Sequence, residues 1–181
     1  MTVSHFNELR LELEKGSSEK GHPFRFCTLA TVGLDRMARL RTVVLRHLGK
    51  DLALTFYTDK RSKKVLHIKE NRNVSLLFYH PGKQLQLRME GVGVVIKDPE
   101  RLKGLWKGLE KRHRKDYTTS LAPGSILEKP ETLEYLQDEN YFCALEVHPF
   151  KIEYLKLKKP DHLRIRFSRL ENDWKREFLV P

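Results

Sequence analysis

The sequence predicts a mainly β protein with short α-helical insertions, folded as a closed antiparallel barrel. Short segments rich in β-forming residues recur along the chain, and tight turns join many of them. Strands this short and this numerous favour an antiparallel barrel over a parallel sheet. Closure would also remove the exposed edges of such a sheet. At 181 residues the chain suits a single domain over residues 1–181.

The expected strands fall into two groups along the chain. The first group is Phe24–Val32, Met37–Arg46, Leu52–Thr58, Asn73–Tyr79 and Gln84–Ile96. The second group is Phe142–Val147, Lys151–Leu157, His162–Leu170 and Trp174–Val180. Within Gln84–Ile96 the apolar residues Leu85 and Leu87 alternate with Gln86 and Arg88, so a polar row faces either water or a ligand.

The expected helices lie between and before these strands. They are Ser4–Lys15, followed by a loop at Gly16–Ser18; Ser62–Glu70; a helix from Asp98 to about His113; and Pro130–Leu136. Ser62 and Asp98 are the expected N-caps, and Pro99 suits the first helical position. The segment Arg114–Lys129 is predicted to be irregular, and loops of that length often set specificity.

Composition and charge narrow the possible partners. Hydrophobic residues make up 39% and charged residues 33%, which is typical of a soluble globular protein. The net charge of +11 favours an anionic partner: nucleic acid, a membrane surface or a phosphorylated small molecule. No apolar run approaches the roughly 18 residues of a membrane span, and Met1–Phe6 lacks a signal-peptide pattern. We therefore expect a cytoplasmic protein without membrane contact.

Metal and haem sites are not expected. Cys27 and Cys143 sit in apolar stretches without a CxxC partner, and they are predicted to be buried free thiols. The histidines show neither an HExxH pattern nor the spacing of an axial ligand.

Four basic residues suggest a phosphate site. Arg41 and Arg46 are five apart on one strand, so they point to opposite faces. Lys63 and Lys64 fall in the first turn of a helix, where the helix dipole disfavours cations. A bound phosphate, met there by free backbone N–H groups, would offset this placement. The alternative is that both lysines are ordinary surface residues.

A set of motifs carries a resemblance to a known family. In order these are Arg41-Thr42-Val43-Val44-Leu45-Arg46, Phe56-Tyr57-Thr58, Ser62-Lys63-Lys64, Asn73-Val74-Ser75-Leu76-Leu77-Phe78-Tyr79, Gln86-Leu87-Arg88-Met89-Glu90-Gly91 and Glu171-Asn172-Asp173-Trp174-Lys175-Arg176. As a set they resemble the pyridoxamine 5'-phosphate oxidase family over most of Phe24–Gly91 and again over Glu146–Pro181. The resemblance implies an FMN-binding split β-barrel of Greek-key type and a homodimer with FMN at the subunit interface.

The resemblance also implies roles for particular residues. Arg41, Lys63 and Lys64 would hold the FMN phosphate, and Gln86 would hydrogen-bond the cofactor. Arg166 would reach the flavin from the partner subunit. The ribityl chain and flavin ring would be lined by the backbone of Thr42, Val43, Val44 and Leu45 and by Tyr57 and Thr58.

The substrate half of the site departs from the family pattern. Arg46 replaces a lysine, and Leu155 stands where a tryptophan is expected. The family's Tyr-Phe-x-x-Arg-Pro-x-x-Ser segment has no counterpart in Leu105–Tyr117, and His162–Arg166 exchanges an Arg and a His. The candidates for substrate contact are therefore Arg46, Tyr117, His162 and Arg164, and a plain surface or loop role is the alternative for the last three.

The expected activity is that of an FMN-dependent oxidoreductase with a different or unknown small substrate, an amine or a phosphorylated compound. It would pass hydride to flavin N5. One alternative is a non-catalytic FMN-binding or sensing protein. Another is a basic nucleic-acid-binding barrel, although no RNP-type aromatic pair is present and Lys111–Lys115 reads more simply as a solvated helix end.

Overall fold

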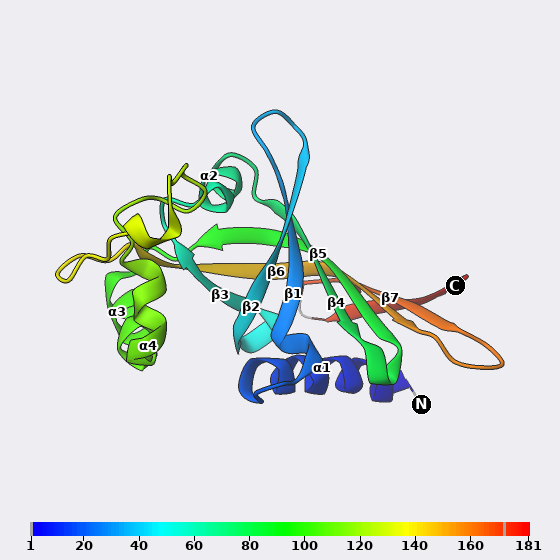
Figure 1. The fold of residues 1–181 in the computed structure, drawn as a ribbon. Helices are drawn as coiled ribbons and strands as arrows, with labels where there is room; N and C mark the ends of the chain where they lie inside the picture. The colour runs from blue at the N-terminus through cyan, green and yellow to red at the C-terminus, as the bar shows by residue number, and fades with distance from the viewer. Residues whose placement is uncertain (1, 172) are drawn as a thin grey trace.

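The structure, a computed structural model, describes residues 2–171 and 173–181 and forms one antiparallel sheet of eight strands. The strands are β1 (Phe26–Val32), β2 (Ala38–Leu48), β3 (Leu54–Asp59), β4 (Asn73–His80), β5 (Leu85–Val95), β6 (Phe142–Lys156), β7 (Leu163–Arg169) and β8 (Trp174–Leu179). Their order is β3-β2-β1-β4-β5-β6-β7-β8, and β3 also pairs with β6. This second pairing closes six strands into a barrel, while β7 and β8 extend from β6 (Figure 1). Because β4 returns to lie beside β1, the predicted Greek-key barrel is confirmed.

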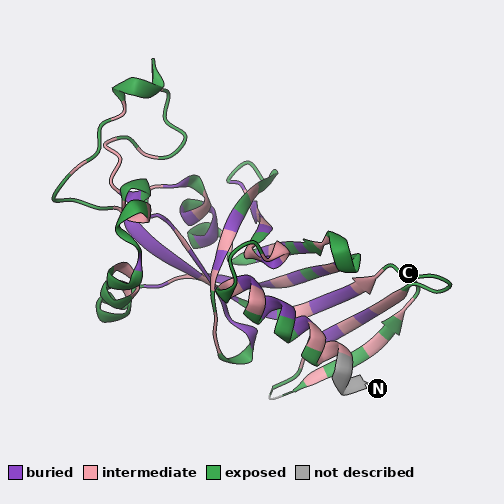
Figure 2. Ribbon diagram, turned by 60° about the horizontal axis from the view of Figure 1, so that its bottom comes forward, coloured by how far each residue is buried: buried purple, intermediate pink, exposed green. Residues whose placement is uncertain are grey.

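The core fills the barrel and continues under the first helix. The fully buried side chains include Phe24, Phe56, Phe78 and Tyr154. Figure 2 shows the buried residues as stripes along the strands, as expected where alternate side chains point inward. Burial of one such side chain contributes about 1.5–3 kcal/mol to stability. The two cysteines, Cys27 and Cys143, are buried free thiols, as predicted.

The described residues form four α-helices outside the barrel: α1 (Thr2–Ser18), α2 (Lys63–Glu70), α3 (Pro99–Gly108) and α4 (Lys111–Arg114). Helix α1 lies across one end of the barrel, where Leu9 and Leu13 are completely buried (Figure 1). Asp98 caps α3 as predicted, because its Oδ1 accepts hydrogen bonds from the backbone of Glu100 at 3.0 Å and Arg101 at 3.3 Å. In the part of the chain that is described, no helix has the length and apolar character to cross a membrane.

Two helix predictions are wrong about the residue at which the helix ends. The loop expected at Gly16–Ser18 is helical, since Gly16 allows close approach to Phe24, whose atoms a Cβ would meet at 2.7 Å. The helix expected from Asp98 to His113 ends at Gly108 and restarts as α4. Arg114 closes this break by donating to the backbone carbonyls of Leu109 and Lys107, both at 3.0 Å.

Two further predictions differ from the structure in the second half of the chain. The helix expected at Pro130–Leu136 is only a 3-10 turn over Pro130–Thr132. The strands expected at Phe142–Val147 and Lys151–Leu157 are one strand, β6, which runs through Pro149. A register shift in β5 between Glu90 and Gly91 places Gly91 opposite Pro149. The proline lacks an N–H, and this irregularity accommodates it without ending the strand.

One motif position cannot be followed into three dimensions. Asn172, part of the C-terminal motif, lies outside the described residues. The neighbouring residues from Trp174 onward form β8, and Trp174 packs against the barrel core.

Candidate functional site

Arg41 lies at the start of the inward-facing row of β2. It is paired across the sheet with Leu29 of β1, on the same side as the buried Val43 and Leu45. Its Nη1 donates to Thr31 Oγ1 at 2.7 Å and to the Leu29 carbonyl at 3.2 Å. These contacts fix the guanidinium at the rim of the barrel while leaving its charge without a carboxylate partner among the described residues.

Lys64 lies beside this rim in the first turn of α2. Its Nζ donates to Thr58 Oγ1 at 2.9 Å, and the Thr58 and Ser62 hydroxyls are 3.2 Å apart. Ser62 occupies the N-cap position, but its hydroxyl makes no capping hydrogen bond, contrary to the prediction. The first turn of α2 contains no acidic residue, and the Val65 N–H donates to the Ser62 carbonyl at 3.0 Å, which leaves the N–H groups of Lys63 and Lys64 at the start of the helix. Lys63, in contrast, is exposed.

The electrostatics of this corner favour a bound anion. Burial, followed by the charge of Arg41, lowers the pKa of Lys64. Burial also lowers the pKa of Arg41. Both cations are thus held in a partly desolvated place without full compensation, which costs free energy. An anion bound between them would supply the missing charge, so Arg41, Lys64, Thr58 and Ser62 fit a phosphate group.

Between Arg41 and Arg46, strand β2 can present its backbone to a ligand but few of its side chains. Val43 and Leu45 point into the core, Val44 is half-buried and Thr42 is exposed. Since their side chains are used for packing or face outward, only the backbone of this stretch could line a flat ligand, as the resemblance implies.

Arg46 lies at the other end of β2, at a register shift between Leu45 and His47. Its guanidinium carbon is 5.5 Å from the centre of the Tyr57 ring, and its buried Nε has no hydrogen-bond partner among the residues that the structure describes. Burial raises the pKa of Tyr117, and the neighbouring Arg46 opposes that rise. The structure therefore brings together Arg46, Tyr57 and Tyr117, two of which were predicted substrate contacts.

An aromatic cluster supports this second corner. Tyr117 is 7% exposed and packs with Phe142, whose ring centre is 5.3 Å away, and with Leu109. Trp106 of α3 joins the cluster at 5.4 Å from Phe142. Tyr117 is thus a buried residue of this cluster with its hydroxyl near Arg46, which is not the plain surface or loop role weighed as the alternative, and its contact with a substrate stays a prediction.

Gln86 lies on the outward face of β5 in a row with Arg88 and Glu90. It is opposite Tyr79 on β4 and Leu155 on β6, and it is half-buried. The predicted contact of Gln86 with the cofactor stays a prediction, because this face is separate from the inward-facing row that carries Arg41.

The C-terminal arginines differ from Arg41 and Lys64 because each has an acidic partner. Arg164 Nη2 donates to Glu153 at 2.7 Å, and Arg166 Nη2 donates to Glu177 at 3.0 Å. His162 lies in the β6–β7 turn, where its Nδ1 accepts a hydrogen bond from the Lys158 backbone at 3.2 Å. Within the chain, these three predicted residues are not brought to Arg41 or Arg46.

Three residues of the site were missed by sequence reasoning. Thr31 Oγ1 contacts both Arg41 and, at 3.0 Å, the buried His67 of α2. A polar residue at the inward position of a strand, after Cys27 and Leu29, was the available signal for Thr31. Arg61, between Asp59 and Ser62, links the site to a distant loop, and a single sequence offered no signal for that contact.

A separate cluster of Glu12, His22 and His80 places donor atoms within 4.8 Å of one another. Each imidazole Nδ1 accepts a backbone N–H, from Phe24 at 3.1 Å and from Lys83 at 3.2 Å. The proton of each neutral ring therefore resides on Nε2, the atom that faces Glu12. A metal ligand needs an unprotonated nitrogen there, so the cluster fits a buried carboxylate with polar partners better than a metal site.

Comparisons with known proteins agree on one family. Residues 6–97 match the model of the pyridoxamine 5'-phosphate oxidase FMN-binding domain. A pyridoxine/pyridoxamine 5'-phosphate oxidase of Leptospira biflexa is 29% identical over 168 residues, which cover 85% of this chain and 78% of that protein. One of Haemophilus influenzae is 26% identical over 166 residues, covering 84% and 78%.

Solved structures share the fold over nearly the whole chain. A pyridoxamine 5'-phosphate oxidase-related, FMN-binding protein of Nostoc punctiforme has a TM-score of 0.80 at 24% identity, covering 97% of this chain and 96% of its own. PhzG of Burkholderia lata, solved with tetrahydrophenazine-1-carboxylic acid, also has a TM-score of 0.80 at 22% identity, covering 98% and 92%.

Proposed function

This chain belongs to the pyridoxamine 5'-phosphate oxidase FMN-binding family, its cofactor is FMN, and we propose that it acts as an FMN-dependent oxidoreductase. The observation that carries the proposal is the pair of partly buried cations, Arg41 and Lys64, that has hydroxyl and carbonyl partners but no carboxylate among the described residues. Such a pair suits the phosphate dianion of FMN. Each charge-assisted hydrogen bond would contribute about 1.5–3 kcal/mol.

The chain's own residues have separate tasks in this proposal. Arg41, Lys64 and the Thr58 hydroxyl hold the phosphate, and the backbone of β2 supports the ring. A bound FMN would supply the redox chemistry, with flavin N5 as the hydride acceptor. Arg46, with its unpartnered Nε and with Tyr117 beside it, would orient an anionic or amine-bearing small substrate next to the ring.

FMN and riboflavin together provide a sharp test of the phosphate site, because riboflavin lacks the phosphate. Flavin fluorescence titrations should show that Arg41→Ala combined with Lys64→Ala weakens FMN binding about 10²- to 10⁴-fold. Riboflavin binding should change less than about threefold, since the phosphate contacts do not contribute to it. A matched control is Arg10→Ala with Lys20→Ala, which removes two exposed charges on and after α1. If the double variant kept the preference for FMN over riboflavin, the assignment of the phosphate site would be wrong.

Turnover separates an enzyme from a flavin-binding protein without catalysis. The holoprotein should oxidise or reduce at least one member of a panel of pyridoxamine 5'-phosphate, pyridoxine 5'-phosphate, other amines and nicotinamide nucleotides. Loss of that turnover in Arg46→Met, with FMN still bound, would support the substrate corner. FMN binding without turnover of any member would favour the storage or sensing role instead.

We also propose a homodimer, supported by an apolar outer face of the barrel. Phe26 is 55%, Leu40 67%, Leu77 40% and Tyr79 49% exposed. Strand pairing places them on one face, because Thr28 of β1 is opposite both Thr42 of β2 and Leu77 of β4. Exposed apolar patches of this kind mark protein interfaces. Leu40→Asp should convert a dimer to a monomer in sedimentation analysis.

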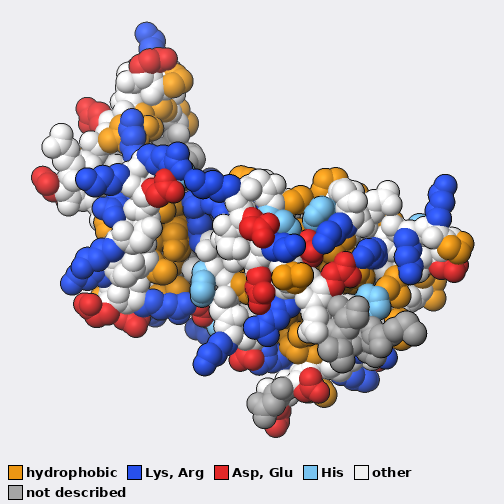
Figure 3. Space-filling view, turned by 90° about the horizontal axis from the view of Figure 1, so that it is seen from below, with side chains coloured by type: hydrophobic (Ala, Val, Ile, Leu, Met, Phe, Trp, Pro, Cys, Tyr) orange, Lys and Arg blue, Asp and Glu red, His pale blue; other side chains and the backbone are white. Residues whose placement is uncertain are grey.

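A second group of Lys and Arg residues, apart from the proposed phosphate site, lies on the surface. Figure 3 shows Lys and Arg side chains gathered on the side where α3 and α4 lie. The exposed basic residues of this region include Lys103, Lys107, Lys111 and Arg112. Their side chains are solvated, and two of them have acidic neighbours on the same element or next to it, Lys103 with Glu100 and Arg112 with Glu110. This arrangement favours a solubilising surface over a nucleic-acid groove.

A further inference from the structure

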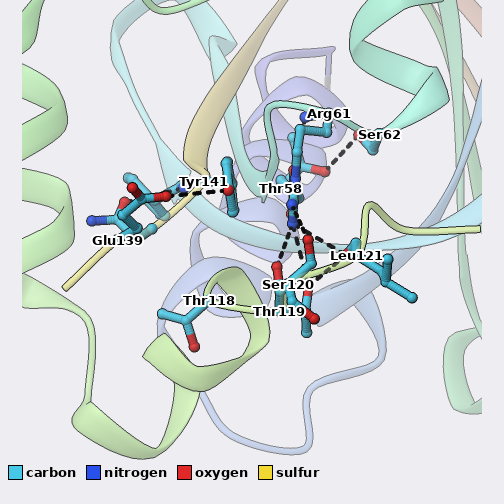
Figure 4. A network of polar contacts seen from close by, with 12 residues as sticks. Thr58, Arg61, Ser62, Thr118, Thr119, Ser120, Leu121, Glu139 and Tyr141 are labelled. Carbon is cyan, nitrogen blue, oxygen red and sulfur yellow. Dashed lines mark hydrogen bonds and ion pairs between the residues drawn. The ribbon is translucent and has the colours of Figure 1, made fainter. Parts of the chain in front are cut away.

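Arg61 joins the turn after β3 to a segment about sixty residues away. Its guanidinium donates to Asp59, with Nη2–Oδ2 at 2.7 Å, and Asp59 is 4% exposed. The same group donates to the backbone carbonyls of Thr119 at 2.8 Å, Ser120 at 3.1 Å and Leu121 at 3.2 Å. Figure 4 shows these bonds converging on one side chain.

The aromatic ring of Tyr141 completes the environment of Arg61. The guanidinium carbon lies 3.3 Å from the centre of that ring. The backbone N–H of Lys60 donates to the Tyr141 carbonyl at 2.8 Å, and the Tyr141 N–H donates to the Tyr117 carbonyl at 2.7 Å. Both ends of residues 117–141 are therefore fastened to the turn of residues 59–61.

Only an arginine supplies this combination of contacts. Three consecutive carbonyls and a carboxylate need several N–H donors in a flat, fixed arrangement, and the guanidinium offers five. A lysine would keep the charge but place its donors at one point. The contacts at Arg61 thus depend on geometry as well as on charge.

The position of Arg61 connects the two corners of the site. Thr58, Ser62 and Lys64, the proposed phosphate ligands, flank Arg61 in the sequence. Tyr117, at the start of the fastened segment, lies beside Arg46 at the substrate corner. A phosphate bound to residues on both sides of Arg61 would immobilise its backbone, and the side chain would transmit that order to residues 117–121.

We propose that Arg61 is a positioning residue through which FMN binding orders residues 117–121 and 136–141 and so sets Tyr117 against Arg46. The inference rests on the proposed function, since it takes the 58–64 turn as the phosphate site. It assigns a role to a residue whose side chain contacts Asp59, residues 119–121 and Tyr141, none of which is a proposed phosphate ligand.

Hydrogen exchange measured by mass spectrometry tests the coupling without any substrate. In the wild-type protein, saturating FMN should slow exchange about tenfold in peptides spanning 117–121 and 136–141. In Arg61→Met the FMN affinity should stay within about threefold of wild type, because Arg41 and Lys64 remain. The protection of these two peptides by FMN should be lost. Arg61→Lys should behave like Arg61→Met, and methylguanidinium added to Arg61→Met should restore part of the protection.

Arg114→Met is the matched control. Arg114 also lies over an aromatic ring, Trp106 at 5.3 Å, and it also donates to backbone carbonyls, but it contacts α3 instead of the 59–61 turn. This variant should keep the FMN-dependent protection.

The possible failures point to different conclusions. Equal FMN-dependent protection in wild type and both Arg61 variants would overturn the positioning role. Wild-type protein that binds FMN without added protection would overturn the coupling and leave the phosphate site intact. Wild-type protein that shows no FMN binding by absorbance would overturn the proposed function, and the coupling with it. If Arg61→Met failed to fold, as judged by circular dichroism, Arg61→Lys would carry the comparison.

Discussion

Arginines at the two ends of the β-sheet differ in whether an acidic side chain pairs with them. At the β2–α2 corner, Arg41 and Lys64 contact hydroxyls and a carbonyl but no carboxylate among the described residues. On β5–β7, Arg88 and Arg164 share Glu153, with the shorter bond to Arg88 Nη2 at 2.5 Å. The difference teaches that charge alone does not mark an anion site. An anion site is indicated by a partly buried cation for which the fold provides no counter-ion.

The free-energy cost of desolvation explains why an unpaired cation is more informative than a paired one. A partly buried cation costs free energy unless an opposite charge compensates it. The fold supplies that charge on β6, where Glu153 is 9% exposed between two guanidinium groups. At the β2–α2 corner the contacts of Arg41 and Lys64 are hydroxyls and a carbonyl, and under the proposed function the phosphate of FMN supplies the compensating charge. From the sequence, Arg41 and Arg164 were alike candidate site residues, and only the structure separates them.

The largest effect should come from giving the β2–α2 corner a counter-ion of its own. Thr58→Asp would place a carboxylate beside Lys64 and repel the phosphate of FMN. Two unit charges about 4 Å apart at an effective dielectric near 20 interact by about 4 kcal/mol, so FMN affinity should fall about 10³-fold. Flavin fluorescence titration measures this change.

Thr58→Asn is the control for shape, because it is nearly isosteric with aspartate and uncharged. It should lower FMN affinity no more than about tenfold, since only one hydrogen bond is altered. Similar losses in Thr58→Asp and Thr58→Asn would mean that packing, and not charge, decides binding at this corner.

The opposite change, removal of a counter-ion from the paired region, should affect stability and not FMN binding. Glu153→Gln leaves Arg88 and Arg164 facing a neutral amide, and the free energy of unfolding should fall by about 1–3 kcal/mol. For a chain of this size the melting temperature should drop about 2–4 °C for each kcal/mol. Glu131→Gln, at an exposed position, is the control. A thermal melt with an unchanged midpoint would show that the Glu153 pairs contribute nothing net.

The pH dependence of stability gives a smaller and more gradual effect. Burial and the neighbouring charges of Lys83 and His22 lower the pKa of His80, although Glu12 opposes this shift. The folded protein therefore binds fewer protons than the unfolded chain just below pH 6.5, so stability falls as the pH decreases through that value. One proton can contribute at most about 1.4 kcal/mol per pH unit.

His67 contributes with the same sign, because burial and Arg41 lower its pKa as well. Urea unfolding between pH 7 and about pH 5 should thus show a shallower slope in His80→Asn than in wild type. An identical slope in both proteins would place the proton uptake elsewhere.

Local patterns predicted much of the fold. Alternation located all eight strands within a few residues, and Asp98-Pro99 located the start of α3. The continuity of β6 through Pro149 was not predictable, because it depends on Gly91 of a different strand. The ion pairs of the C-terminal arginines depend likewise on register, which places Arg166 opposite Glu177.

The candidate site, like the fold, was only partly predictable from the sequence. Arg41, Thr58 and Lys64 were identified from motifs, since short spacing keeps the β3–α2 turn together. Tyr117 and Arg61 act through residues far away in sequence, Phe142 and Thr119–Leu121. Long-range packing of this kind leaves no local pattern. The contacts of Arg61, and the packing of Tyr117, which the resemblance had already suggested as a substrate contact, therefore emerged only from the structure.

The smallest expected effect concerns Arg166, and measuring it tests whether this residue belongs to the flavin site. The resemblance implies that Arg166 reaches the flavin from the partner subunit, whereas within one chain it is paired with Glu177. If both hold, binding must break the ion pair, and Glu177→Gln should raise FMN affinity roughly two- to fivefold by removing this competitor. Glu131→Gln serves as the control for net charge. Unchanged affinity in Glu177→Gln, together with unchanged affinity in Arg166→Gln, would assign Arg166 to the paired region, and the FMN site would then rely on the β2–α2 cations alone.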